Sequence, residues 1–181
     1  MCSRFSLTSP PEAVRAYFAT RNALDFPARY NIAPTQPVLI VRAAQGGGRE
    51  QHLVRWGLIP SWLKDPRSFS TLINARSETA AEKPSFRGAM RHRRCLVPTT
   101  GFYEWTGTPG AKKPHLIRPR QGGLMAMAGL AEHWVGADGS ELLRVDVDGQ
   151  DEGAQGLGDL HAEPAHPADS HEDGGVLIGQ P

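Results

Sequence analysis

Cysteine is scarce in this sequence of 181 residues, which contains only Cys2 and Cys95. No second CxxC-type pair is present to complete a zinc site, so no metal is expected. No apolar run approaches the roughly 18 residues needed to span a bilayer, and the N-terminus lacks the charged-then-apolar pattern of a signal peptide. We therefore expect a reduced, soluble, cytoplasmic protein with no metal, no cofactor and no membrane partner.

Aromatic residues are absent after Trp134, and the balance of charge changes in the same region. Residues 1–143 carry 19 Lys and Arg against 10 Asp and Glu, a net charge of +9, whereas residues 144–181 carry one against nine, a net charge of −8. A basic part that bears aromatic residues suits a polyanionic partner, and an acidic, aromatic-free segment is typical of disorder. We predict a globular domain over 1–143 and a disordered tail over 144–181 that does not complete the core.

Apolar runs bounded by Gly, Pro and Asn predict a chain rich in strands. We expect strands at 38–41, about 52–58, 95–98, 113–119 and 124–134, and a hairpin turn at 136–140 that leads into 141–143. One helix begins near Pro10. The spacing of Val14, Tyr17 and Phe18 predicts that these three side chains share its buried face.

Cys2 suggests a specific chemistry. Removal of Met1 leaves one residue with both a free α-amine, of pKa about 7.7 to 8.0, and a thiol, of pKa about 8.5, so both have reactive fractions at neutral pH. The amine can condense with an aldehyde to an imine, and the thiolate can then close on the imine carbon to give a thiazolidine. The alternative interpretation is a terminal residue of no consequence. Cys95 is predicted to be a small buried apolar residue rather than a nucleophile.

Other candidate residues combine charge with aromatic rings. Glu104 lies within the sequence GFYEW, where it is a candidate general acid or base, although strand alternation equally predicts a solvent-facing side chain. Trp62, near Lys64, is a candidate platform for base stacking or a hydrophobic plug. The densest basic cluster predicts either a nucleic-acid-binding surface or a solvated face; it consists of Arg87, Arg91, His92, Arg93 and Arg94.

Five motifs occur in a defined order: MC at 1–2, RYNIAP at 29–34, WGLIP at 56–60, NARSET at 74–79 and GFYEW at 101–105. Together they resemble the SOS response-associated peptidase (SRAP) family over roughly residues 1–143. The resemblance implies an α+β fold with a mixed, barrel-like sheet, a few flanking helices and an incomplete C-terminus. Proteins of this family crosslink themselves to abasic sites in single-stranded DNA through the N-terminal cysteine, which protects the lesion during replication.

The resemblance also implies roles for individual residues. Cys2 would supply both nucleophiles, Asn74 would position them, and Glu104 would move protons during ring closure. The residues implied to contact DNA are Arg4, Trp62 and Arg76. The protein would be a monomer that acts in the DNA damage response, with hydrolase or lyase activity, and would associate with the nucleoid when bound to DNA.

The sequence departs from the family in two places. Ser3 stands where members commonly have glycine, and the family's later strands and histidine are not recognisable after residue 143. Whether a tail histidine replaces the missing one stays open; the tail histidines are His161, His166 and His171. Three other functions also stay open: a thiol peptidase that releases its own Met1, a non-covalent single-stranded-DNA-binding module, and an inactive truncated copy.

Overall fold

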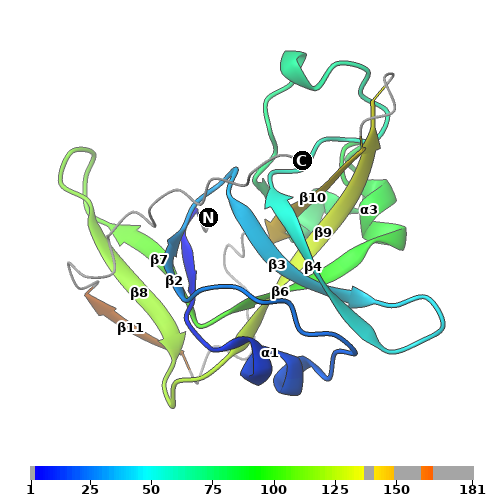
Figure 1. The fold of residues 1–181 in the computed structure, drawn as a ribbon. Helices are drawn as coiled ribbons and strands as arrows, with labels where there is room; N and C mark the ends of the chain where they lie inside the picture. The colour runs from blue at the N-terminus through cyan, green and yellow to red at the C-terminus, as the bar shows by residue number, and fades with distance from the viewer. Residues whose placement is uncertain (1–2, 137–140, 149–159, 165–181) are drawn as a thin grey trace.

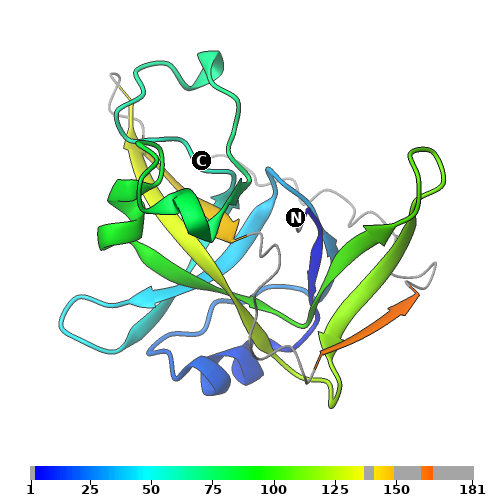
Figure 2. The same ribbon diagram turned by 180° about the vertical axis from the view of Figure 1, so that it is seen from behind.

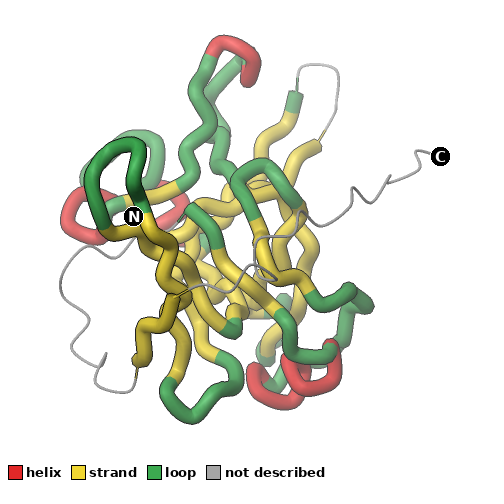
Figure 3. The backbone as a smooth tube through the Cα atoms, turned by 90° about the vertical axis from the view of Figure 1, so that its left-hand side faces the viewer, coloured by secondary structure: helices red, strands yellow, loops and turns green. Residues whose placement is uncertain are grey.

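The structure is a computed structural model that describes residues 3–136, 141–148 and 160–164. Within these residues the chain forms two sheets and a few short helices, which Figures 1 and 2 show from opposite sides. The helices are α1 (Pro11–Phe18), α2 (Ser77–Ala80), α3 (Arg87–His92) and a 3-10 turn, η1 (Pro66–Ser68). In Figure 3 the helices lie at the periphery of the strands. The predicted β-rich α+β class is confirmed.

Five strands close a mixed barrel. In order around it they are β4 (Arg49–Trp56), β3 (Pro37–Ala43), β6 (Arg94–Thr99), β9 (Met125–Val135) and β10 (Glu141–Asp148). Neighbours in this order pair antiparallel, and a parallel pairing of β10 with β4 closes the ring. The short strand β5 (Asn74–Ala75) pairs with the same edge of β10 as β4 does, next to β4 along that edge. The pairing with β10 therefore fixes the position of β5 relative to the barrel.

The second sheet is antiparallel and includes the first strand of the chain. Its order is β11 (Leu160–Pro164), β8 (Lys113–Pro119), β7 (Gly101–Thr106), β1 (Phe5–Leu7) and β2 (Arg29–Ile32). Phe5 joins this sheet to the barrel, because its side chain is 1% exposed and its ring centroid lies 5.3 Å from that of Trp56. The N-terminal strand thus belongs to the second sheet and packs against the barrel through Phe5.

The buried face of α1 is narrower than predicted. Val14 and Phe18 are buried, but Tyr17 is 59% exposed. On a helix, residues three and four apart lie to either side of the same stripe, so Phe18 lies on one side of Val14 and Tyr17 on the other. Because α1 has only eight residues, its contact with the core is a single stripe, and Tyr17 falls outside it.

The predicted boundary at residue 143 falls inside a barrel strand. β10 continues to Asp148, and Val145 and Val147 are both fully buried. Contrary to the prediction, residues 144–148 complete the barrel. The alternation of Val145 and Val147 with charged residues is the pattern of a strand, but the low aromatic content and net negative charge of the tail concealed it.

The described part of the tail also includes β11, which pairs antiparallel with β8. His161 lies in β11 opposite Arg118 in this register. The remaining predicted tail, residues 149–159 and 165–181 with His166 and His171, lies outside the described residues.

Candidate functional site

Cys2, the predicted nucleophile, lies outside the described residues, which begin at Ser3. Strand β1 runs antiparallel to β7, with Phe5 opposite Phe102. The same register carried on by two residues brings Ser3 level with Glu104. The amide of Tyr103 donates to the carbonyl of Arg4 at 2.9 Å, so the pairing extends to the residue before β1, and the described chain begins next to the part of β7 that carries Glu104.

Glu104 is half-buried in the middle of β7. Its neighbour Tyr103 is 5% exposed and donates its hydroxyl to the carbonyl of Tyr30 at 2.8 Å, which holds β7 in place. Because side chains alternate along a strand, Tyr103 and Trp105 project from the opposite face of β7. Of the three aromatic neighbours in the sequence, only Phe102 shares the face of Glu104.

His115 is a candidate residue that the sequence analysis did not single out. It lies on β8 directly opposite Glu104, on the same face of the sheet, and its Nε2 is 2.9 Å from the Thr106 hydroxyl oxygen. Directly opposed side chains have Cβ atoms about 4.5 to 5.5 Å apart. An imidazole therefore lies next to the predicted carboxylate. From the sequence, His115 could have been found only by working out the register of the hairpin between β7 and β8.

Asn74 is held at the edge of the barrel by two connections. Its strand β5 pairs with β10, with Asn74 opposite Val147. The preceding carbonyl, of Ile73, accepts a 2.9 Å hydrogen bond from the indole Nε1 of Trp56, whose ring contacts Phe5. The side-chain Oδ1 of Asn74 is buried and has no hydrogen-bond partner within the described residues. It is therefore an acceptor available to a group that those residues do not supply.

Arg4 and Arg76 each lie next to one of the predicted catalytic elements. Arg4 is half-buried at the start of β1, where its backbone carbonyl accepts from the amide of Tyr103 at 2.9 Å and its Nη1 donates to the carbonyl of Ser3 at 2.9 Å. Arg76 is exposed directly after β5, two residues beyond Asn74. The structure therefore places Arg4 beside Ser3 just before β1, and Arg76 just after β5, which carries Asn74.

Trp62 lies in a different setting. Its side chain is 58% exposed and meets the ring of Phe69 edge-on, with the centroids 6.3 Å apart. It lines a groove of about 590 Å³ with Arg87 and Arg91 of α3, and none of Asn74, Arg76 and Glu104 lines that groove. The structure thus places Trp62 with the basic cluster. One member of the cluster, Arg93, is neutralised by Glu132 at 2.6 Å.

Cys95 is buried, and burial raises the pKa of its thiol to about 12. The thiolate is the nucleophilic form, so Cys95 is inert near neutral pH, as predicted. No group of three or more His, Cys, Asp and Glu that could hold a metal occurs within the part of the chain that the structure describes. In the same part, no helix is long and apolar enough to cross a membrane.

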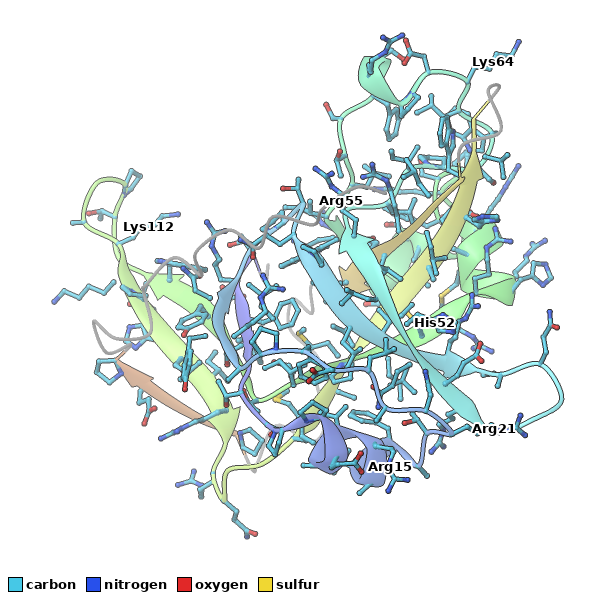
Figure 4. All side chains as sticks on the ribbon, viewed as in Figure 1. Arg15, Arg21, His52, Arg55, Lys64 and Lys112 are labelled. Atoms are coloured by element: carbon cyan, nitrogen blue, oxygen red, sulfur yellow. The ribbon has the colours of Figure 1, made fainter. Side chains whose placement is uncertain are left out.

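Positively charged side chains project at several points around the molecule (Figure 4). Lys64 lies on the long loop between β4 and β5, Lys112 lies at the hairpin between β7 and β8, and Arg55 lies at the end of β4. Arg15 and Arg21 lie on the opposite, lower side.

Comparison with known proteins gives consistent results. The model of the family "SOS response associated peptidase (SRAP)" matches residues 1–161, past the boundary predicted at 143. Abasic site processing protein YoqW of Bacillus subtilis is 38% identical over 146 residues, which cover 78% of this chain and 65% of the relative. Abasic site processing protein YedK of Escherichia coli is 31% identical over 175 residues, covering 89% of this chain and 72% of the relative. The chain thus spans about two thirds of the length of these relatives.

Solved structures share the same fold. A protein of Bacteroides thetaiotaomicron superposes with a TM-score of 0.74 at 22% identity, covering 93% of this chain and 78% of that one. A protein of Bordetella bronchiseptica superposes with a TM-score of 0.71 at 26% identity, covering 88% and 78%. Because the family model covers most of the chain, the conclusion is direct: this chain belongs to the SOS response-associated peptidase family.

Proposed function

We propose that this chain processes abasic sites in single-stranded DNA by forming a covalent thiazolidine through Cys2. The ring-opened abasic sugar presents an aldehyde, with which the α-amine of Cys2 condenses, releasing water. The thiolate then adds to the imine carbon, and the nitrogen takes up a proton. The observation that carries the proposal is the register of β1 on β7, which leads the chain at Ser3 to the level of Glu104.

The predicted site residues can supply the groups that this reaction needs. Glu104 carries protons from the amine to the leaving water during imine formation, and then carries the thiol proton to the ring nitrogen during closure. Asn74 offers a buried amide oxygen with no partner among the described residues, which can orient the amine. Arg4 and Arg76 bind phosphates on either side of the lesion. Ser3 occupies the register position opposite Glu104, and Cys2 is the next residue, with a Cα atom about 3.8 Å from that of Ser3.

Intact-mass measurement tests the proposal directly. The purified chain is incubated with a single-stranded oligonucleotide that contains one abasic site. The expected product has the mass of the chain without Met1 plus the oligonucleotide, less one water. Turnover of a peptide substrate without any DNA adduct would instead identify a thiol peptidase, and reversible binding of DNA without an adduct would identify a non-covalent binding module.

Replacing Glu104 by Gln should slow crosslinking by about 100-fold or more, because the amide cannot carry the proton. Affinity for undamaged single-stranded DNA should stay within about twofold, since a proton carrier acts on the chemical step. Single-turnover adduct formation and fluorescence anisotropy measure the two quantities. Glu82→Gln, at an exposed position, makes the same change of charge and should affect neither. Equal losses of rate and affinity in Glu104→Gln would assign Glu104 a structural role.

Replacing Arg76 by Ala should remove one phosphate contact. The plot of log affinity against log salt concentration for single-stranded DNA should then become less steep by about 0.7. Anisotropy titrations between low and moderate salt measure the slope. Arg21→Ala serves as the control, because Arg21 is exposed on the far side of the molecule. A slope for Arg76→Ala that equals the slope of this control would remove Arg76 from the DNA-binding surface.

A further inference from the structure

Two arginines oppose each other where the barrel closes. In the parallel pairing of β10 with β4, Arg144 lies directly opposite Arg55. Like charges in directly opposed positions destabilise a sheet. Arg55 is exposed and Arg144 is half-buried, so water screens the repulsion only in part. The barrel therefore carries an unfavourable pair of charges at the junction that closes it.

No acidic side chain within the described residues forms an ion pair with either arginine. Arg144 donates from Nη1 to the carbonyl of Gly57 at 3.3 Å, and its Nε is buried without a hydrogen-bond partner in the described part of the chain. Burial lowers the pKa of the Arg144 guanidinium, and the charge of Arg55 lowers this pKa further. The charges of the two guanidinium groups are therefore not balanced by an acidic side chain within the described residues.

The pair lies close to the proposed reaction site. Arg144 is three residues before Val147, which is opposite Asn74, and three residues of strand span about 10 Å. Arg144 also holds the carbonyl of Gly57, the residue after Trp56, whose ring contacts Phe5. Arg55 lies at the end of β4, well away from Arg15 and Arg21 (Figure 4).

We propose that Arg55 and Arg144 form a phosphate-binding site for the backbone of the bound single strand. Guanidinium groups present paired N–H donors that match two phosphate oxygens, and one phosphate between two arginines replaces their repulsion with attraction. The identity of the ligand as DNA rests on the proposed function. The anion site itself rests on the register, which sets the two guanidinium groups side by side, and on the lack of an acidic partner for either of them within the described residues.

The test uses the full chain and an undamaged single-stranded oligonucleotide, so it does not depend on Cys2. The variants are Arg55→Gln, Arg144→Gln and the double variant, with Arg21→Gln as the matched control. In the double variant, the slope of log affinity against log salt concentration should become less steep by about 0.7. This is the change expected for the loss of one phosphate contact and not of two. Because Arg55→Gln removes repulsion in the free protein, it should raise the midpoint of thermal unfolding while it weakens DNA binding. A purely structural arginine would change these two quantities in the same direction.

A salt slope for Arg55→Gln and the double variant that equals that of Arg21→Gln would overturn the proposal. If Arg144→Gln does not fold, Arg55→Gln carries the test, because its side chain is exposed, and Arg144→Lys keeps the charge. Inorganic phosphate is the second probe: it should shift the Nε–H resonance of Arg144 in the wild type and not in Arg55→Gln, and the absence of any shift in the wild type would count against an anion site. A wild type that binds DNA through this pair but forms no adduct would refute the proposed crosslinking alone.

Discussion

Replacing Cys2 by Ser is expected to reduce the heat-stable adduct with abasic single-stranded DNA to background. Serine keeps the α-amine, so an imine can still form, but its hydroxyl is not ionised at neutral pH and cannot close a stable sulfur ring. Denaturing electrophoresis after heating measures the surviving adduct. Retention of Met1 or acetylation of the amine should be equally damaging, because the ring needs the amine and the thiol on one residue.

The chain provides a matched control in its other cysteine. Cys95 is buried and its pKa is raised to about 12, so Cys95→Ala should retain the adduct in full. An adduct from Cys2→Ser that is as heat-stable as that of the wild type would rule out the thiazolidine. Loss of the adduct in Cys95→Ala with the fold intact would move the nucleophile to Cys95.

Replacing Val145 by Asp is expected to lower the free energy of unfolding by about 3 to 5 kcal/mol, since it leaves an unpaired charge in the barrel core. Val145 is fully buried and lies opposite Trp56, where β10 closes the ring. Domains are commonly stable by only about 5 to 15 kcal/mol, so a loss of this size should unfold a measurable fraction. Urea denaturation followed by circular dichroism gives the value.

Val135 provides the same substitution at an exposed position. It ends β9 with 52% of its side chain exposed, and Val135→Asp should cost less than about 1 kcal/mol. Equal stability of the two variants would mean that residues 144–148 contribute nothing to the core and that the domain ends at residue 143, as its composition suggests.

Several elements could be predicted from the sequence because they depend on the types and spacing of neighbouring residues. The apolar runs at 38–41 and 124–134 predicted β3 and β9 to within a few residues. The burial of Cys95 also followed from its residue type and its position in an apolar run. The family was identified from five short motifs, because each keeps its residues and spacing whatever the tail contains.

Other features depended on contacts between distant residues. The pairing of β10 with β4 joins residues 55 and 144, and no local pattern indicates which edge of a strand receives which partner. The same holds for Glu104 and His115, which are opposed only through the register of their hairpin. The aromatic flanks of Glu104 were misleading for a related reason: neighbours in sequence lie on opposite faces of a strand.

The sequence by itself determined that the chain is β-rich, that its charge is divided between a basic part and an acidic part, and that its motifs are those of the SRAP family. These properties depend on residue type, order and spacing. Only the tertiary structure decided that β10 continues past residue 143 to complete the barrel, that Glu104 faces His115, and that Arg55 faces Arg144. The physical reason is that strand pairing brings together residues far apart in the chain, and its register is chosen by the burial of the whole core.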